Sequence, residues 1–539
     1  MADEMLDVAI VGGGVSGVYS GWRLLTKGGR TNVTVFEASD RIGGRLLSVP
    51  APGIPNMVAE LGGMRILPSV QPRIGALIEE LNAEVGLKEQ IKTYPFPVDQ
   101  PENIAFLRGT HLRLSDFGLP VQPAPGTAEL QRTPIPYRVG FLERGNTPGG
   151  IVINAIEQIV PGITAEGLTE AQRSEMAHQA YFDGKPLMEQ GFWQVLVRVI
   201  SGEAYQLALD AGGYQTTLTN WNAADAIPWY LSDFGVNPDY RGFIKGFQQV
   251  PLELARLFRK AGGTVELGAQ LAGFEQVEGG VELTFSDGRT VRAKELILAM
   301  PRRSLELIAP GSPLLQELRV SQLIKSVTPR PLFKLFTTYA DPWWLPANVK
   351  AGRTTTDLPV RQTYYWPTNT GAPATSGPAM LMASYDDGVN IGFWDSFRPK
   401  RGVGWRAGAG DIPQPEMFQN ADPEKADPQW TENAAPQAMV DEVQRQLGLI
   451  HGMSFVPRAR NAAFRDWGDD PFGGGWNSWN IGVDSRQVKM DILQPTPGAP
   501  VYICGEAYSD AQGWVEGALQ TADLMLEKLG VTPTVSSGI

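Results

Sequence analysis

The sequence predicts an α/β protein whose sheet-forming segments are separated by long insertions. Three blocks of strand and helix patterns support this class: residues 5–37, 264–299 and 499–529. Each block combines short apolar runs, typical of buried strands, with turn residues or with apolar residues at helical spacing. At 539 residues the chain is several times the usual domain length, so we expect two or three domains.

The first block has the pattern of a strand, a helix and a second strand. Met5 to Val11 becomes fully apolar, Val15 to Thr26 carries apolar residues at helical spacing, and Asn32 to Glu37 repeats the strand pattern. The run Gly12-Gly13-Gly14-Val15-Ser16-Gly17 lies between the first strand and the helix. This order predicts a βαβ unit with a glycine-rich turn, as in Rossmann-like dinucleotide-binding domains.

The residues of this turn have separate predicted tasks. Gly12 permits a tight turn, Gly14 lets the backbone approach a pyrophosphate, and Gly17 permits close packing of the helix on the strand. The start of the helix offers unpaired N–H groups and a positive dipole end to the phosphates. Glu37 is placed to accept hydrogen bonds from a ribose hydroxyl, which favours a dinucleotide without a 2′-phosphate. This motif alone does not separate NAD from FAD.

A second pair of glycines favours FAD. In Arg41-Ile42-Gly43-Gly44-Arg45, two glycines between arginines let a backbone and a cation reach the second phosphate of an extended cofactor. Near the C-terminus, Cys504-Gly505-Glu506 ends a strand pattern and Gly513-Trp514 opens a helix pattern. Together these segments predict a site for FAD.

The remaining patterns divide the chain into interleaved regions. Residues 169–258 are mostly helical in pattern, and residues 331–394 carry strand-like runs such as LFKLFTTY, RQTYYW and AMLMASYDD. Residues 388–436 are rich in Pro, Gly, Asp and Trp, which predicts a long surface excursion or lid. We therefore expect a Rossmann-like FAD domain, an interleaved mixed-sheet substrate domain and a helical insertion. The expected boundaries are 1–70, 241–325 and 456–539 for the first, 71–120 and 326–455 for the second, and 121–240 for the third.

Composition excludes several other classes of function. The chain has 46 basic and 58 acidic residues, a net charge of −12 that opposes binding to nucleic acid or to anionic membranes. A single cysteine excludes an internal disulfide, and three distant histidines argue against a metal centre. Met1 to Asp7 lacks a signal-peptide pattern, and no apolar run is long enough to cross a bilayer. We expect a protein of the cytoplasm or another reducing compartment. A precursor whose targeting segment had been removed would have the same sequence.

These motifs together resemble the flavin amine oxidase superfamily of monoamine oxidases, polyamine oxidases and L-amino acid oxidases. The resemblance covers most of the chain and is clearest at residues 5–67, 264–301, 326–340 and 500–526. It implies non-covalent FAD, because Gly475 stands where monoamine oxidases have the cysteine that bonds to the flavin. The implied cofactor contacts are Gly12, Gly14, Val15, Ser16, Gly17, Glu37, Ala38, Arg41, Gly43, Gly44, Arg45, Gly62, Gly63, Met64, Arg65, Leu271, Trp467, Gly505, Glu506, Gly513, Trp514 and Val515.

The segment Glu60-Leu61-Gly62-Gly63-Met64-Arg65-Ile66 resembles L-amino acid oxidases in particular. Its arginine clamps the substrate carboxylate in that family, a task that suits the planar, two-pronged guanidinium of Arg65. The strand MLMASYDDG implies Tyr385 as a second carboxylate ligand, with Tyr364 and Tyr365 as alternatives. An arginine at this place favours amino acids over simple amines.

Three further matches concern the reacting end of the substrate. Trp476 and Trp514 match the aromatic walls on either side of the substrate, and the Gly513 carbonyl is implied to lie near the amine. The flavin-proximal lysine of the family, which holds a water near N5 and assists the reaction with oxygen, matches Lys334. The strand pattern around Lys334 leaves open a lysine that simply points outward. Lys334 and Trp514 are the implied catalytic residues.

The resemblance implies FAD-dependent oxidative deamination of L-amino acids, with hydride transfer from Cα to flavin N5. The products are a 2-oxo acid, ammonia and hydrogen peroxide. An amine or polyamine oxidase, an amino-acid 2-monooxygenase of the same fold and a non-catalytic flavin-binding module stay open. Asp386 and Asp387 either select a basic side chain or face solvent in a turn, while the aromatic surroundings equally favour phenylalanine, tyrosine or leucine. The expected partners are the amino acid and oxygen, and the expected assembly is a homodimer or a higher homo-oligomer.

Overall fold

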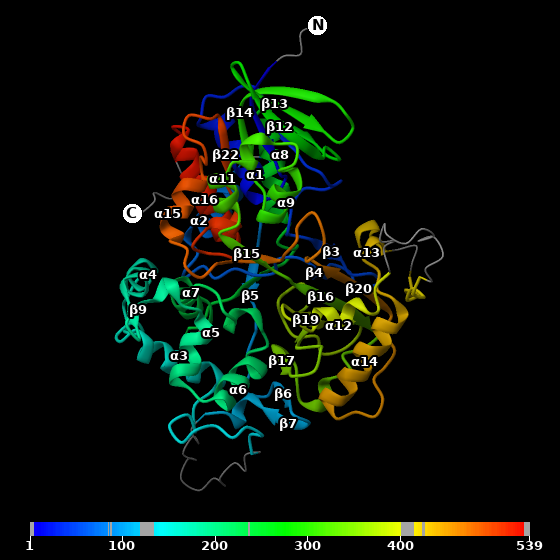
Figure 1. The fold of residues 1–539 in the computed structure, drawn as a ribbon. Helices are drawn as coiled ribbons and strands as arrows, with labels where there is room; N and C mark the ends of the chain where they lie inside the picture. Colours follow the sequence, from blue (N-terminus) through cyan, green and yellow to red (C-terminus); the bar gives the residue numbers. More distant parts are fainter. Residues whose placement is uncertain are drawn as a thin grey trace.

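Two seven-stranded sheets and a group of helices make up the part of the chain that the computed structural model describes. This part comprises residues 5–84, 86, 89–118, 134–235, 238–399, 414–422 and 426–532. Figure 1 shows the first sheet at the top and, below it, a helical unit on the left and the second sheet on the right. The predicted α/β class with an interleaved mixed sheet and a helical insertion is confirmed.

The first sheet is built on the strand predicted before the glycine-rich turn. β1 (Leu6–Val11) lies between two parallel partners, β2 (Val33–Phe36) and β14 (Thr290–Leu298), and β11 (Thr264–Glu266) extends the sheet beyond β2. The other side of β14 pairs with antiparallel β13 (Gly280–Phe285) and then with parallel β22 (Val501–Ile503), while β12 (Leu271–Val277) pairs with β13. Since β1, β2, β14 and β22 are parallel, the loops that follow them meet at one edge of the sheet.

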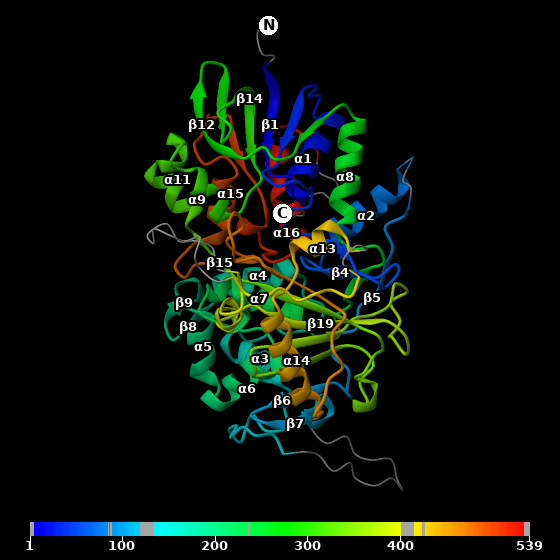
Figure 2. The same ribbon diagram turned by 90° about the vertical axis from the view of Figure 1, so that its right-hand side faces the viewer.

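Both faces of this sheet are covered by helices. Val8 and Ile10 point into one apolar cluster and Ala9 and Val11 into another, which explains why this strand is apolar throughout. Figure 2 shows the covering helices on opposite sides of the sheet. One face carries α1 (Val15–Thr26), α2 (Pro72–Ala83), α8 (Gln249–Lys260) and α16 (Val515–Lys528), and the other carries α9 (Arg302–Ile308), α10 (Pro313–Gln316), α11 (Leu318–Ile324) and α15 (Ser485–Ile492).

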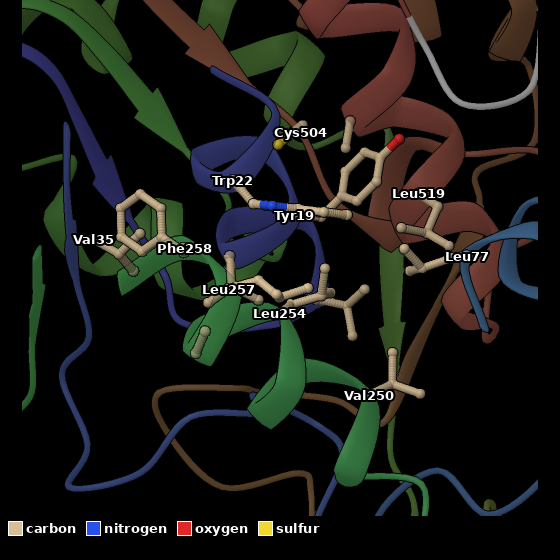
Figure 3. Close-up of a cluster of buried hydrophobic side chains, with 14 of the residues drawn as sticks. Tyr19, Trp22, Val35, Leu77, Val250, Leu254, Leu257, Phe258, Cys504 and Leu519 are labelled. Atoms are coloured by element: carbon tan, nitrogen blue, oxygen red, sulfur yellow. The ribbon is translucent and has the colours of Figure 1, made fainter. Parts of the chain in front are cut away.

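The helix after the glycine-rich turn is the centre of the larger apolar cluster. Figure 3 shows Tyr19 and Trp22 of α1 packed near Leu254 and Leu257 of α8. Each fully buried leucine of this kind stabilises the fold by about 1.5–3 kcal/mol. A Cβ at Gly21 would lie 2.9 Å from the Phe258 ring, so the close approach of α1 and α8 requires glycine at this position.

The second sheet is assembled from distant segments in the order β20, β16, β19, β18, β17, β6, β7. The strand patterns expected within residues 331–394 form its centre, β16 (Phe333–Tyr339), β19 (Ala379–Asp386), β18 (Gln362–Tyr365) and β17 (Arg353–Thr356). The hairpin of β6 (Ile104–Leu107) and β7 (Thr110–Arg113) adds to β17.

The strand at the far edge of this sheet departs from the expected domain division. β20 (Asn461–Asp466) lies within the range 456–539 expected for the FAD domain, yet it pairs with β16. A run as short as NAAFRD shows a strand pattern without showing which sheet the strand joins. The other domain boundaries stay a prediction.

The helical unit consists of α3 (Pro148–Ile159), α4 (Glu170–Gln179), α5 (Phe192–Val199), α6 (Gly202–Gly212) and α7 (Ala223–Phe234). Four of these helices begin at a side chain that accepts a hydrogen bond from a backbone N–H of the first turn, namely Thr147, Thr169, Ser201 and Asn222. Such caps each stabilise a helix by about 1 kcal/mol. The helices bury their apolar faces against one another in a core of their own, separate from those of the first sheet.

The region 388–436, expected as a surface excursion, is partly built into the core. α12 (Ile391–Asp395) and α13 (Pro428–Glu432) bury Trp394 and Trp430 completely. Helices of five residues are too short to show periodicity, which is why the sequence pattern missed them. Residues 400–413 and 423–425 of this region lie outside the described residues.

Short pairs of strands connect the larger parts. They are β3 (Ser48–Pro50) with β4 (Val58–Glu60), β5 (Thr93–Pro95) with β10 (Arg241–Phe243), β8 (Tyr181–Phe182) with β9 (Lys185–Pro186), and β15 (Val327–Arg330) with β21 (Trp476–Trp479). The longest helix of the second sheet's side is α14 (Gln437–His451). In the described part of the chain, no helix combines the length and the apolar character needed to cross a membrane.

Candidate active site

A cavity of about 900 Å³ lies at the edge where the parallel strands of the first sheet end. Its walls include the loops after β1, β2, β14 and β22, side chains of β16 and β19 in the second sheet, and side chains of the helical unit. Ligands of open parallel sheets bind at this edge. Every residue predicted from the sequence to contact cofactor or substrate lines this cavity, with the exceptions of Gly17, Arg41 and the two alternative tyrosines, Tyr364 and Tyr365.

The glycine-rich turn after β1 has the geometry that the motif predicts. Gly12 has a φ of +116°, and a Cβ there would lie 2.4 Å from the Ala299 carbonyl oxygen. A Cβ at Gly17 would lie 1.9 Å from the Gly12 oxygen, so Gly17 acts through the packing of α1 on β1 and stands behind the cavity wall. At Gly14 the nearest atom to an added Cβ is 3.9 Å away, which leaves the backbone open to a ligand.

Glu37 stands at the end of β2 and lines the cavity beside this turn. Its carboxylate accepts hydrogen bonds from the Gly13 N–H at 2.6 Å and from the Ser39 N–H and hydroxyl at 2.9 and 2.7 Å. The acid therefore organises the turn and presents its oxygens to the cavity. The predicted bond to a ribose hydroxyl fits this position and stays a prediction.

The second glycine pair shapes the opposite wall of the turn. Gly43 and Gly44 have φ values of +134° and +57°, and a Cβ at Gly44 would lie 3.2 Å from the Gly14 Cα. The expectation that Arg41 faces the cofactor is not met, because its guanidinium donates to the carbonyls of Gly44 at 2.6 Å and Leu46 at 2.9 Å. Arg41 holds the loop from behind, while Arg45 is the arginine of this pair that reaches the cavity.

Glu506, after β22, is a buried junction between three segments. Its carboxylate forms an ion pair with Arg45 at 2.7 Å and accepts hydrogen bonds from the N–H groups of Asn477 at 3.0 Å and Gly513 at 2.7 Å. The Asn477 side-chain amide donates to the second oxygen at 2.9 Å. The predicted cofactor role of Glu506 thus comes with a structural one, since this carboxylate fixes Arg45 and the start of α16.

Arg65 lies at the other end of the cavity. Its guanidinium is buried, lies 4.0 Å from the centre of the Tyr240 ring, and donates to the hydroxyls of Tyr364 at 3.2 Å and Tyr214 at 3.3 Å. Burial acts to lower the pKa of Arg65, but the neighbouring tyrosine oxygens and Asp233 favour the charge more, so the pKa is raised. No carboxylate of the described residues lies within 4.0 Å of this guanidinium.

Lys334 points inward from β16 and lines the cavity, which decides between the two alternatives left open by the strand pattern. Its ammonium donates to the Gly62 carbonyl at 2.5 Å and the Glu60 carbonyl at 3.2 Å, and it lies 4.9 Å from the centre of the Tyr385 ring. Burial lowers the pKa of Lys334, and Arg65 acts in the same direction. Burial also raises the pKa of the Glu60 carboxyl, whose charge supports the lysine.

Aromatic side chains form a further part of the cavity wall. Trp476 stacks on Trp229 of α7 with ring centres 5.5 Å apart, and Trp514 precedes α16 beside it. Tyr385 contacts Tyr214 edge to face at 5.4 Å. The Trp467 indole donates to the Leu61 carbonyl at 2.8 Å and so supports the segment that carries Arg65.

The structure also changes the reading of the two aspartates after β19. Asp386 and Asp387 are fully buried, so the solvent-facing alternative is wrong. Asp387 lines the cavity, but its oxygens accept from the N–H groups of Gln215 and Thr216 and from the Thr216 hydroxyl. Asp387 therefore anchors the segment that presents Tyr214. Burial raises the pKa of both carboxyls, that of Asp386 to about 7.

Several wall residues come from the helical unit and were not singled out from the sequence: Tyr214, Thr217, Trp229, Asp233 and Phe234. One signal was available, because Asp233 stands on the buried stripe of α7 together with Ala226 and Tyr230. An acidic residue on an otherwise apolar, buried helix face indicates that its carboxylate binds a polar or charged group. Among the described residues, no three His, Cys, Asp or Glu side chains gather as metal ligands do.

The sequence model of one protein family, described as flavin containing amine oxidoreductase, matches residues 15–401. The chain belongs to this family. The chain is 28% identical to Aplysianin-A of Aplysia kurodai, over 97% of this chain and 90% of that protein. It is 24% identical to an L-amino-acid oxidase of Siganus canaliculatus, over 96% of this chain and 83% of that protein. Its fold is similar to that of a putrescine oxidase bound to putrescine, with a TM-score of 0.64 at 17% identity over 98% of both chains.

The cofactor of this flavin-containing amine oxidoreductase is FAD, and the cavity suits it. Open backbone at Gly14 and at the start of α1 fits a pyrophosphate, and Glu37 stands where a ribose would follow. Ala38 and Leu271 also line the cavity, and their contact with the cofactor, implied by the family resemblance, stays a prediction. FAD is non-covalent if Gly475 marks the attachment position, and that assignment stays a prediction.

Proposed function

We propose that the protein oxidises L-amino acids to 2-oxo acids with release of ammonia and hydrogen peroxide. The observation that carries the proposal is Arg65, a buried guanidinium in the cavity wall with aromatic and hydroxyl neighbours in place of an acid. Asp233 favours the charge of Arg65 from a distance, but no described carboxylate pairs directly with the guanidinium, and a bound substrate carboxylate would do so with two parallel hydrogen bonds. Simple amines carry no group that would do so.

The hydroxyls around Arg65 complete a site for a carboxylate. Tyr214 and Tyr364 accept hydrogen bonds from the guanidinium and hold it in place, while the Tyr364 hydroxyl donates a long hydrogen bond of 3.4 Å to the Gln362 side chain. A substrate carboxylate is a stronger acceptor that these O–H groups would turn to. Tyr385, predicted to bind the carboxylate, lies in contact with Tyr214. This arrangement fixes the orientation of Cα relative to the rest of the cavity.

The other residues prepare the amine end. Trp476, Trp514 and Trp229 exclude water, which favours the neutral amine that the oxidation requires. We expect the Gly513 carbonyl, in a turn with φ of +86°, to accept a hydrogen bond from that amine. FAD, when bound, accepts the hydride from Cα and delivers the electrons to oxygen. The positive charge of Lys334 supports the oxygen step because it stabilises negative charge that develops nearby.

The test is anaerobic mixing of the purified yellow protein with L-amino acids, their D-enantiomers and the corresponding decarboxylated amines, with the flavin absorbance as the readout. We expect bleaching by L-amino acids only, and formation of 2-oxo acid and peroxide once oxygen is admitted. Bleaching by amines alone would replace the proposal with an amine oxidase. An amide product of lower carbon number would identify a 2-monooxygenase.

A further inference from the structure

The acidic residues in the cavity wall differ in how far their oxygens are already used. Glu37, Glu506 and Asp387 each accept three or more hydrogen bonds from neighbouring protein groups. Asp470 lies near the surface and pairs with Arg303 at 2.8 Å. Asp233 is the remaining acid among the described wall residues.

Asp233 keeps one carboxylate oxygen available. Its Oδ1 accepts a hydrogen bond from the Tyr240 hydroxyl at 3.0 Å, and no described residue donates to Oδ2. The residue is 6% exposed as a whole, and it lines the cavity. A buried carboxylate that opens only onto a cavity is a binding group for a cation.

Tyr240 holds this acid and the carboxylate-binding arginine at a set separation. The ring of Tyr240 lies under the Arg65 guanidinium, while its hydroxyl donates to the Asp233 side chain and, at 2.7 Å, to the Asp233 carbonyl. If Asp233 served only to neutralise Arg65, a direct ion pair would be the favourable geometry. The two groups are instead not within 4.0 Å of each other, and both face the cavity.

The charges around Asp233 make it decisive for a cationic ligand. The cavity is also lined by four basic residues, Arg45, Arg65, Lys334 and Arg465. They repel a positively charged substrate side chain except where an acid offsets their charge. Burial raises the pKa of Asp233, while Arg65, Arg353 and the Tyr240 hydroxyl favour its charged form. A guanidinium or ammonium docked at Oδ2 favours the charged form further.

We propose that Asp233 binds the positively charged end of the substrate side chain, and that the preferred substrates are L-amino acids with cationic side chains, such as arginine and lysine. This inference rests on the proposed function, because it places the substrate carboxylate on Arg65. The helical unit thereby contributes the specificity of the site, through the last turn of α7. The structure assigns Asp386 and Asp387, the acids suggested by the sequence, to the support of the wall.

The test compares cationic amino acids with neutral ones of the same shape. Oxidation of L-arginine is measured against L-citrulline, and oxidation of L-lysine against L-norleucine, with the flavin-loaded wild type and with Asp233→Asn. The matched control is Asp239→Asn, the same chemical change at an exposed residue of the following segment outside the cavity wall. Flavin content and thermal unfolding show that each variant is folded.

We expect the wild type to have a kcat/KM for arginine about 100 times that for citrulline, and Asp233→Asn to remove roughly that whole preference through a higher KM. Citrulline, norleucine and the control variant stay within about 3-fold of the wild-type values. Asp233→Glu keeps part of the preference. Tyr240→Phe, which preserves the ring under Arg65 and loses the hydroxyl, weakens the preference by roughly 5-fold to 10-fold.

Two results would overturn the inference while leaving the proposed function intact. In one, the wild type oxidises arginine and citrulline equally well. In the other, Asp233→Asn lowers all four substrates by the same factor, which would make Asp233 a support for Arg65. Failure of the proposed function has a different signature, since the wild type would then oxidise none of the four amino acids.

Discussion

At the scale of single residues, the most unusual group is the buried ammonium of Lys334. Burying a charge costs several kcal/mol, and the lysine recovers part of that cost through two backbone carbonyls. The Glu60 carboxylate favours the charge as well, but it makes no direct ion pair with the lysine, because its own oxygens accept from the Ser48 hydroxyl and the Phe247 N–H. A charge kept under these conditions beside a reaction cavity indicates a catalytic task.

The first prediction concerns this charge. In Lys334→Met, reoxidation of the reduced enzyme by oxygen slows by about 100-fold, because the positive charge that stabilises developing negative charge is gone. Reduction by the amino acid changes by less than about 3-fold. Stopped-flow measurement of the two half-reactions checks this, with Lys350→Met at an exposed site as the control.

In the wild type, reoxidation slows as the pH rises through the lowered pKa of Lys334, since the charged form is lost. Equal slowing of both half-reactions would assign Lys334 a purely structural role.

Arg65 leads to a second prediction, on geometry at constant charge. Arg65→Lys keeps the positive charge but loses the planar fork, so kcat/KM for L-amino acids falls by roughly 100-fold. Reoxidation of the reduced flavin by oxygen, which involves no substrate carboxylate, is not affected to this extent. Stopped-flow measurement of the two half-reactions gives the ratio. Equal loss in both half-reactions is the result that would contradict a carboxylate-binding role.

At the scale of elements, the junction of β1 and α1 depends on a contact that only glycine allows. We predict that Gly17→Ala lowers the free energy of unfolding by about 2–4 kcal/mol and weakens FAD binding, because the added Cβ would lie 1.9 Å from the Gly12 oxygen. Gly202→Ala in α6 is the control, since nothing lies within 4 Å of its added Cβ. Thermal unfolding and flavin content are the measurements. Equal stability of the two variants would show that the turn relaxes freely.

The end of α14 provides a prediction about acid stability. The His451 ring is buried, with Nε2 2.7 Å from the Tyr365 hydroxyl and Nδ1 donating to the Leu447 carbonyl at 2.8 Å. Burial lowers its pKa from 6.5 to about 4. Below pH 6.5 the unfolded chain therefore takes up a proton that the folded chain refuses, so stability is lost as the pH falls from about 6.5 to about 4, by roughly 3 kcal/mol.

Denaturant unfolding between pH 4 and 7 measures this loss. His451→Gln is expected to flatten the slope by the amount that His451 contributes, whatever its effect on the baseline stability. His111→Gln, at an exposed ring, is expected to keep the wild-type slope. The same slope in both variants would show that other groups cause the acid sensitivity.

Elements also show what the sequence allowed us to predict. The turn at Gly12, Gly14 and Gly17 was predictable because its geometry depends on neighbours within a few residues. The strand pattern alone did not show that Lys334 points inward, because that depends on a segment brought in by the fold, and only the family resemblance implied it. The support role of Arg41 was missed because the pattern does not show which way the loop turns its carbonyls. Asp233 is the intermediate case: its place on an apolar stripe was visible, but the cavity it faces was not.

At the scale of the whole molecule, the cavity is the place where both sheets and the helical unit meet. Loops of the first sheet, β16 and β19 of the second, and α7 of the helical unit all contribute to its wall. Hydrogen bonds join these parts around it: the Trp229 indole of the helical unit donates to the Gln512 carbonyl at 2.8 Å, and Lys334 of the second sheet donates to the Gly62 carbonyl at 2.5 Å. A ligand that fills this space stabilises contacts between parts that have separate cores.

The last prediction follows from this position of the cofactor. Treatment at low pH and high salt is expected to release all of the flavin, because Gly475 stands where a covalent link would need a cysteine. The loss of FAD is expected to lower the Tm of the protein. A ligand at 1,000 times its Kd stabilises the native state by about 4 kcal/mol, so the Tm should rise again with added FAD in a concentration-dependent way.

Cleavage by protease in the helical unit should increase in the apo form, because α7 loses the ligand at its cavity face. ADP, which matches only the adenosine diphosphate part of FAD, should restore part of the Tm and leave the helical unit sensitive to the protease. Full protection of the helical unit by ADP would show that stability spreads from the first sheet alone, and flavin that stays with the denatured chain would refute non-covalent binding.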